Sequence, residues 1–405
     1  MDEIDSAESL ESAKNGFQSF EHAAADIVLA ASFNSSGTRI ALCSADHKIR
    51  VYDIDGEDSW ILTDAWRGHD AEILDIQWLP SLLGQFFATI GSDSKFKLWR
   101  EDHSHLSKSG RRFRCIFSQS PPNHVSYVSF GSKAIKHDTY LAMITHDGLL
   151  SLLEPVDAES LTSWSQIDTI NPFGHHPRGT EARFRLSFQQ SEGPCSNALL
   201  AGIGLRTLSL AVSAMNNIKI FRALKPDESS SSSEGNYQFY EMHDMHTDTA
   251  LINEIAWAPG CLRPFDVIAA ACDDGTVRIF EVDTPHESDG SFSMRIPVAK
   301  PPPLQALGPP KGGASFTARN APSGIGAGLA GMSRDTAARR GMAHEVKHES
   351  RQVAVLAPDE PAPVWKVRWL HDGSALASTG DNGKVHLWRE SLSGEWIEFA
   401  ETEPA

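Results

Sequence analysis

Short runs of alternating apolar and polar residues, separated by turn residues, extend along most of the chain. Residues 68–100 (GHDAEILDIQWLPSLLGQFFATIGSDSKFKLWR) show the pattern most clearly. Leu74, Ile76 and Trp78 open this stretch as one alternating run, and two further apolar runs follow, separated by a polar turn. Alternation with a period of two, broken by turn residues, predicts short antiparallel strands. Residues 112–117 supply a fourth strand after a polar loop.

This unit recurs six times along the chain. Its first strand carries an anchor of the form apolar-x-aromatic. That anchor occurs at residues 31–33, 76–78, 128–130, 186–188, 255–257 and 367–369. A second anchor marks the third strand of each unit. It is Tyr52, Trp99, Leu153, Phe221, Phe280 or Trp388.

A turn residue precedes each third-strand anchor by six positions. These residues are Asp46, Asp93, Asp147, Met215, Asp274 and Asn382. A short carboxylate or amide accepts backbone N–H bonds in a tight turn and tolerates the geometry of that turn. The fourth unit has Met215 at this position, so we expect Asn216 or Asn217 to build its turn.

The complete unit is typical of one blade of a WD-repeat propeller. The Gly68-His69 pair, followed by Asp93 and then Trp99, matches the corner, turn and third strand of such a blade. A single blade cannot bury both of its faces, so several blades must stack into a ring. The sequence therefore predicts an all-β fold, a six-bladed β-propeller that spans residues 17–400.

Several segments lie outside the repeat pattern. Residues 17–21 form a short amphipathic piece, which can pair as the outer strand of the last blade. The Pro/Gly/Arg-rich insertion leaves the outer edge of blade five or the connection from blade five to blade six, and residues 353–356 resume the strand pattern after it. The segments predicted to be tails, loops or disordered are the acidic residues 1–16, the serine-rich stretch KPDESSSSSEG, the insertion 284–349 and the tail 401–405.

Composition narrows the possible partners. The formal net charge of −17 argues against direct binding to nucleic acid, which needs clustered Lys and Arg. No apolar run is long enough for membrane insertion, and the acidic N-terminus is unlike a secretory signal, so we expect a cytosol-facing protein. The five cysteines are scattered, and we interpret them as reduced, with Cys43 and Cys272 in strands of the core.

The sequence contains no pattern that predicts catalysis, a metal or a cofactor. We interpret His69, Asp93 and Trp99 as a hydrogen-bonded brace within a blade rather than a catalytic relay. The stretch His243-Asp244-Met245-His246 resembles a metal-binding pair, but it lies where a repeat places its corner histidine, and no third ligand is near in sequence. We therefore expect that the chain is not an enzyme and binds no cofactor.

Four stretches resemble a specific family. They are residues 73–102 (ILDIQWLPSLLGQFFATIGSDSKFKLWRED), 141–164 (LAMITHDGLLSLLEPVDAESLTSW), 252–282 (INEIAWAPGCLRPFDVIAAACDDGTVRIFEV) and 364–388 (VWKVRWLHDGSALASTGDNGKVHLW). They are similar to the small propeller nucleoporin of the Y-shaped scaffold of the nuclear pore. The small propeller subunit of the COPII cage is the near relative of that family.

The resemblance implies an architecture and a set of partners. The ring would be open between blades one and six, and an α-solenoid nucleoporin would donate strands that form a seventh blade. Other subunits of the Y-shaped complex, and subunits of a vacuolar or lysosomal coat-like complex that regulates TOR signalling, would be further partners. The protein would lie at the nuclear pore in the nuclear envelope and peripherally at the vacuolar membrane. The residues expected to contact the donated blade are Ile27, Leu29, Phe33, Val364, Val367 and Trp369.

Two alternatives remain open at this point. One is a subunit of the COPII cage. The other is a closed WD-repeat adaptor that binds peptides on one face of the ring, because six blades can also close on themselves.

Overall fold

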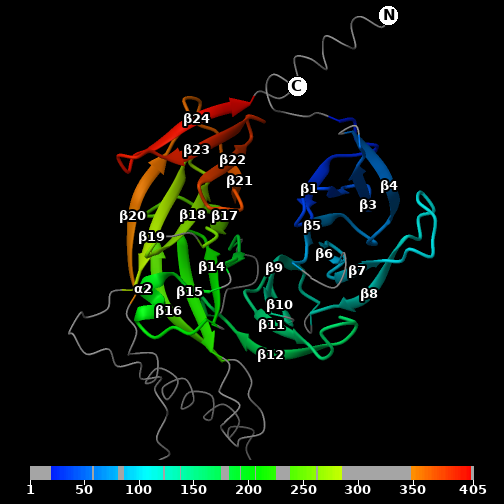
Figure 1. Cartoon of the computed structure of the whole chain (residues 1–405), viewed down its shortest axis with the longest axis horizontal. Coiled ribbons are helices and arrows are strands. Elements are labelled where there is room, and N and C mark those ends of the chain that lie inside the picture. The colour runs from blue at the N-terminus through cyan, green and yellow to red at the C-terminus, as the bar shows by residue number, and fades with distance from the viewer. Residues whose placement is uncertain are drawn as a thin grey trace, which may run out of the picture.

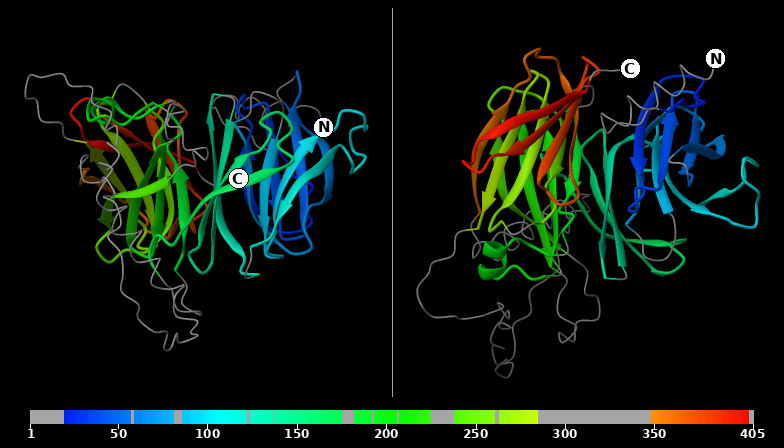
Figure 2. Two further views of the ribbon diagram at one scale, coloured as in Figure 1. Left: turned by 90° about the horizontal axis from the view of Figure 1, so that it is seen from below. Right: turned by 45° about the horizontal axis from the view of Figure 1, so that its top comes forward.

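The computed structural model describes residues 20–402, with gaps at 57–58, 81–85, 122–123, 137, 175–181, 192, 206, 225–237, 261–262 and 285–347. The described residues form six antiparallel sheets of four strands, arranged around a common centre (Figure 1). Within each sheet the strands lie side by side in chain order. In the turned views of Figure 2 the strands run along the depth of the ring. The predicted all-β, six-bladed propeller is confirmed.

Each blade consists of four consecutive strands. Blade one contains β1 (Val28–Phe33), β2 (Arg39–Ser44), β3 (Lys48–Ile54) and β4 (Trp60–Arg67). Blade two contains β5 (Ile73–Trp78), β6 (Phe86–Gly91), β7 (Phe96–Glu101) and β8 (Phe113–Gln119). Blade three contains β9 (Tyr127–Ile135), β10 (Asp138–Thr145), β11 (Leu150–Pro155) and β12 (Trp164–Ile170).

The second half of the chain repeats this arrangement. Blade four contains β13 (Arg185–Phe188), the short helix α2 (Ser196–Leu200), β14 (Leu208–Ala214), β15 (Asn217–Leu224) and β16 (Gln238–His246). Blade five contains β17 (Ile252–Trp257), β18 (Asp266–Cys272), β19 (Val277–Asp283) and β20 (Glu349–Leu356). Blade six contains β21 (Val364–Trp369), β22 (Ala375–Gly380), β23 (Val385–Glu390) and β24 (Trp396–Thr402).

Burial explains the hydrophobic patterns. The second strands β6, β14 and β18 are buried along their whole length, because a neighbouring blade covers each of their faces. Such strands have nearly continuous apolar sequences. The outer strand β24 contains only exposed and half-buried residues, as expected for a strand at the rim of the ring.

A β-bulge lies directly before every third-strand anchor. The pairing of the third and fourth strands shifts register between Val51 and Tyr52, and the other five blades show the same shift at the equivalent position. A bulge bends the strand and increases its twist. The anchor side chain therefore enters the core at the point where the outer strand turns away.

In blade two, hydrogen bonds connect the corner, the turn and the third strand. The Nδ1 atom of His69 lies 2.9 Å from Oδ1 of Asp93, and its Nε2 atom lies 2.8 Å from the hydroxyl of Thr89. The indole N–H of Trp99 donates to the same hydroxyl at 2.9 Å. All four side chains are buried or nearly so, which makes the predicted brace a closed polar network inside the blade.

The turn residues of most other blades act locally. Asp46 accepts a bond from the backbone N–H of Lys48 at 3.0 Å, and Asp274 and Asn382 accept equivalent bonds at 3.0 and 3.1 Å. Asp147 instead accepts a bond from the hydroxyl of Thr145. The buried anchors Phe280 and Trp388 follow at the predicted spacing.

The turn of blade four differs from the prediction. The connection between β14 and β15 contains only Met215 and Asn216, and Met215 itself adopts the left-handed conformation, with φ of 56°. Its N–H donates to the carbonyl of Ala182, and its carbonyl accepts a bond from the N–H of Ile252. The side-chain amide of Asn216 donates to the carbonyl of Asp248 rather than capping the turn. Backbone groups from outside the strand pair, rather than an asparagine side chain, therefore hold this turn.

Three further expectations are corrected. Phe20, the first described residue of the amphipathic piece, packs on Tyr52 and Trp60 of blade one and not on the last blade. The outer strand of blade five resumes at Glu349 rather than at residue 353. The last strand continues to Thr402, beyond the predicted end at residue 400.

The histidines of the 243–246 stretch also lie elsewhere than expected. Both belong to β16, the outer strand of blade four, and not to a corner. Nε2 of His243 lies 2.7 Å from the hydroxyl of Ser350 in the neighbouring blade. The tail 1–16, the whole serine-rich stretch and most of the insertion lie outside the described residues. Because β19 pairs with β20, the insertion interrupts blade five between its third and outer strands.

We predict that Trp99→Ala destabilises the protein by about 3–5 kcal/mol, the usual cost of removing a large aromatic side chain from a core. The ring centroids of Trp99 and Trp66 lie 5.5 Å apart, and Trp99 is almost completely buried. Chemical denaturation of both proteins measures the difference. Trp365→Ala is the control, because Trp365 is 41% exposed and its loss should cost much less. Equal stabilities of wild type and Trp99→Ala would contradict the assignment of the repeat.

We also predict a pH dependence that originates at His69. Burial disfavours the charged imidazolium and lowers the pKa of His69 below its ordinary value of 6.5, although Asp93 acts in the opposite direction. The stabilisation from neutral His69 is therefore complete above the unfolded-state pKa, and it decreases as the pH falls from 6.5 toward the lower folded-state pKa. Unfolding free energies at about pH 7.5 and about pH 5.5 should differ less for His69→Gln than for the wild type. An unchanged difference would contradict the prediction.

Candidate partner-binding site

In the part of the chain that the structure describes, one boundary of the ring joins two blades that share no apolar core. Five clusters of buried residues each combine two neighbouring blades, from the pair of blades one and two to the pair of blades five and six. The sixth cluster contains residues of blade one and Phe20 only. In Figures 1 and 2 the red sheet of blade six and the blue sheet of blade one stand apart. We refer to this place as the open boundary.

Blade one presents an aromatic surface to the open boundary. Ile40, Leu42 and Tyr52 form its floor and are almost completely buried. Phe20 covers part of this floor, with ring centroids 5.2 Å apart between Phe20 and Tyr52. The backbone N–H of Ala23 donates to the Tyr52 hydroxyl at 2.9 Å, which fixes the N-terminal segment in place. The buried apolar surface of this blade is therefore covered from within the chain.

Phe33 extends this surface toward solvent. Strand pairing places Phe33 opposite Ile40, so both side chains lie on the same face of the sheet. Phe33 is 55% exposed, and its ring contacts that of Trp60 at 5.8 Å. A large aromatic residue that is half exposed on a sheet face marks a surface suited to contact with another chain.

Blade six presents a second, less covered surface. Pairing of β22, β23 and β24 places Ala377, Leu387 and Ala400 on the face opposite Trp388. Ile397 and Phe399 are 39% and 43% exposed at the outer part of the blade. This face lacks a neighbouring blade, whereas the other face packs against blade five.

The structure divides the predicted contact residues into two groups. Ile27, Leu29 and Phe33 are exposed, and strand pairing places Phe33 on the face of the open boundary. Val364 and Val367 are buried between blades five and six, and Trp369 packs there as well, with its indole N–H donating to the carbonyl of Ala256 at 3.0 Å. These last three residues cannot line the open boundary, because the alternation of β21 turns them toward blade five. Sequence reasoning also missed Ile397 and Phe399, whose alternation with charged residues in the last strand was the available signal.

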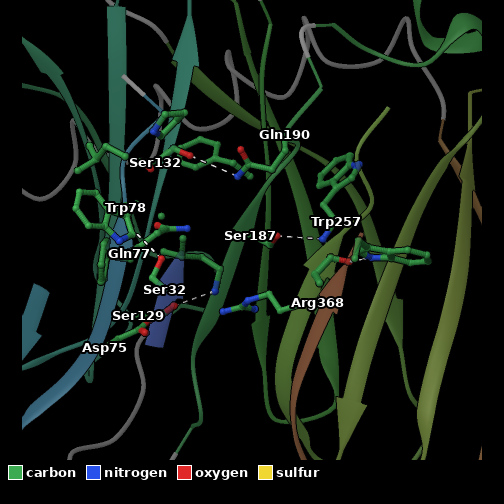
Figure 3. A pocket seen from close by; sticks show the side chains of 18 of the residues that line it. Ser32, Asp75, Gln77, Trp78, Ser129, Ser132, Ser187, Gln190, Trp257 and Arg368 are labelled. Carbon is green, nitrogen blue, oxygen red and sulfur yellow. Dashed lines mark hydrogen bonds between the residues drawn. The ribbon is translucent and has the colours of Figure 1, made fainter. Parts of the chain in front are cut away.

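The first strands of the blades surround a central cavity of about 470 Å³. Figure 3 shows a repeated contact along its wall, in which a serine of one blade binds the next blade. The hydroxyls of Ser32, Ser129 and Ser187 accept bonds from backbone N–H groups of the following blade at 3.1, 3.3 and 3.0 Å. Each serine is the middle residue of an apolar-x-aromatic anchor. The middle residue of the anchor is therefore the position from which these blades form a hydrogen bond to the following blade.

Blade six has Arg368 at this position, and no blade follows it. The Arg368 guanidinium reaches back to Glu254 of blade five at 3.1 Å, and Lys366 contacts the same carboxylate at 2.9 Å. Arg185 lies 3.9 Å from it. Burial alone would raise the pKa of Glu254, but these three cations outweigh burial and hold the pKa at about 2. Glu254 is therefore ionised at neutral pH.

The described residues contain no group of three or more His, Cys, Asp or Glu side chains placed to hold a metal ion. No helix in the described part of the chain is both long and apolar enough to cross a membrane. Cys43 and Cys272 are buried free thiols in β2 and β18, as predicted.

Comparisons with known proteins agree with this architecture. Residues 17–53 and 351–389 match the family model described as WD domain, G-beta repeat. The chain is 27% identical to nucleoporin SEH1 of Chaetomium thermophilum, over 94% of this chain and 93% of the relative. It is 28% identical to nucleoporin SEH1 of Saccharomyces cerevisiae, over 94% and 97%. It is 24% identical to protein transport protein sec13 of Emericella nidulans, over 93% and 96%.

The matched SEH1 proteins are named nucleoporins, in agreement with the interpretation that this chain is not an enzyme. Their similarity extends over 94% of this chain. These similarities and the six four-stranded sheets identify the chain as a WD-repeat propeller whose homologues include SEH1 nucleoporins.

Proposed function

We propose that the protein is a structural scaffold subunit of the Y-shaped subcomplex of the nuclear pore, where an α-solenoid nucleoporin donates strands that complete its ring. The observation that carries this proposal is the open boundary, since blade one and blade six share no apolar cluster. Similarity to SEH1 nucleoporins over nearly the whole chain supports the location at the pore. In this role the protein would support transport of protein and mRNA by maintaining the pore scaffold.

The physical argument concerns what an incomplete ring exposes. Phe33 on one side and Ile397 and Phe399 on the other remain partly in contact with water. Exposed apolar faces of sheets are an aggregation hazard unless another chain covers them. A donated sheet would supply main-chain hydrogen bonds together with apolar burial. An interface that buries on the order of 2,000 Å² would be of the size found in obligate complexes.

The wider assignments belong to the same proposal. We propose further membership in a vacuolar or lysosomal coat-like complex that regulates TOR signalling, with the protein bound peripherally to the cytosolic side of that membrane. A COPII cage subunit is the second candidate, because a transport protein named sec13 is similar over 93% of the chain. The open boundary disfavours the closed peptide-binding adaptor, since a closed ring requires a sixth shared core.

Photo-crosslinking in cells tests the proposal. Phe33 and Phe399 are replaced, one at a time, by p-benzoylphenylalanine, which keeps an aromatic ring at each position. We expect both positions to crosslink to one segment of the same large helical protein. Leu106 is the control position, because it is 84% exposed in a loop of blade two, away from the open boundary.

The identity of the crosslinked protein separates pore, vacuolar and COPII membership. Crosslinks that join the positions at 33 and 399 within one chain would show a closed ring and would contradict the proposal. Crosslinks from the two positions to unrelated proteins would contradict it as well.

We predict that the crosslinked segment stabilises the protein. A segment that binds only the folded chain raises the unfolding free energy by about 2.7 kcal/mol at a free concentration of 100 times its Kd. Thermal unfolding of the purified chain, with the segment and with a scrambled version, measures this effect. A melting temperature that does not respond to the segment would contradict the proposed completion of the ring.

A further inference from the structure

The face of blade six at the open boundary is basic as well as apolar. Strand pairing places Lys366 and Arg368 of β21 on this face, because they lie opposite Thr379 and Ala377. Pairing with Ala375 places Arg389 of β23 on the same face. The paired residues of that face in the described strands include three cations and no carboxylate. This contrasts with the whole chain, whose formal net charge is −17.

The guanidinium of Arg368 has further N–H groups that can donate hydrogen bonds at the edge of the central cavity. Its side chain is 61% exposed, and its described hydrogen bonds, to Glu254 and to the carbonyl of Val367, use only the Nη1 nitrogen. A guanidinium carries five N–H donors and no acceptor. At the position where Ser32, Ser129 and Ser187 accept a bond from the next blade, blade six can therefore only donate.

Glu254 does not neutralise this region. It is one carboxylate in contact with Lys366, Arg368 and, at 3.9 Å, Arg185. Asp75 of blade two, which also lines the central cavity, attracts Arg368 at longer range. Two acids among three cations still leave an excess of positive charge in this region. Such an excess attracts an acidic group that arrives with a partner, and the attraction strengthens when the partner displaces water from the exposed cations.

Arg389 extends the same property to the outer part of the blade. Its guanidinium lies 5.1 Å from the centroid of the Phe399 ring, which holds the cation over the apolar surface. The face therefore combines an aromatic residue and a cation at its rim with two cations near the channel.

We infer that the sheet donated to the open boundary turns an acidic face toward blade six, with a carboxylate of its innermost strand bound by Arg368 and Lys366. This inference rests on the proposed function, and it adds the chemistry of the partner. The serines bind blades one, three and four to their successors within the chain. Arg368, at the same position of blade six, forms a charge-assisted bond to a successor from another chain. A carboxylate matches the planar donors of a guanidinium and forms bonds stronger than those between neutral groups.

Two other occupants are possible on grounds of charge and position. Residues 1–19 include Asp2, Glu3, Asp5, Glu8 and Glu11, and the chain continues from them to Phe20 at the open boundary. A second copy of the chain is also acidic overall. The donated sheet is favoured because it alone would supply main-chain pairing together with the acid.

The experiment uses the full chain with p-benzoylphenylalanine in place of Phe399, and it compares three backgrounds in cells. The first is otherwise wild type, the second carries Arg368→Gln, and the third carries Arg351→Gln. Arg351 is a matched control, since it is an exposed arginine on β20 with one ion pair to a glutamate, Glu281 at 2.7 Å. Mass spectrometry of the adduct identifies the crosslinked peptide and its acidic residues.

We expect an adduct with another protein in the wild-type and Arg351→Gln backgrounds, and a strongly reduced adduct with Arg368→Gln. Binding of the identified segment to the purified full chain should be roughly tenfold weaker for Arg368→Gln and should depend less on salt. Arg368→Lys should retain most of the affinity because it keeps the charge. Replacing the partner's carboxylate by lysine and combining it with Arg368→Glu should restore binding. Thermal unfolding of each variant alone controls for folding.

Several results would overturn the inference. They are equal binding by Arg368→Gln and the wild type, a crosslinked segment without Asp or Glu near the site, an adduct with residues 1–19 or an adduct with a second copy. The absence of any adduct in the wild-type background would instead contradict the proposed function itself. If the inference fails and the proposed function holds, the partner still binds, and Arg368→Gln binds it with the same affinity as the wild type.

Discussion

Apolar packing between neighbouring blades is the interaction on which the remaining structure depends. A four-stranded sheet with two apolar faces is stable only when both faces are covered. Five boundaries satisfy this requirement with cores shared by adjacent blades, such as Trp257 with Ile218 and Ile220 between blades four and five. The polar networks reinforce this arrangement. The His69 brace orders one blade internally, and the serine contacts along the central cavity tie one blade to the next.

The requirement fails at one place, and the molecule responds differently on the two sides. On blade one the chain covers its own core with Phe20, so Ile40, Leu42 and Tyr52 are buried without a neighbouring blade. On blade six the apolar residues Ile397 and Phe399 remain partly exposed, and cations lie beside them. An incoming sheet would thus meet an aromatic, already ordered surface on one side and a basic, uncovered surface on the other.

The repeat could be predicted from the sequence because its anchors are local. Alternation fixes which residues of a strand share a face, and the spacing from turn residue to anchor fixes the length of the third strand, so the number and order of the blades follow. Alternation alone does not predict which neighbouring blade each face of a sheet contacts. Val364 and Val367 were therefore assigned to the open boundary, although they face blade five.

Other features depended on contacts between residues far apart in sequence. The bulge before each anchor alters the register by one residue without a distinct sequence signal in six different contexts. The cover formed by Phe20 requires the three-dimensional proximity of Tyr52 and Trp60. The Met215 turn is held by backbone groups of Ala182 and Ile252, which no local pattern around residue 215 reveals.

The chain passes around the ring once, and the two ends of the propeller do not overlap. Strand β1 belongs to blade one and β24 to blade six, so among the described strands none from one end of the chain completes the sheet at the other end. Small changes in the angle at each of the five packed boundaries therefore add up, and their sum appears as the distance between the terminal blades. A repacked core in blade three or blade four, remote from any partner, would alter the fit of a partner by geometry alone. The width of the open boundary is therefore a property of the whole ring and not of blades one and six alone.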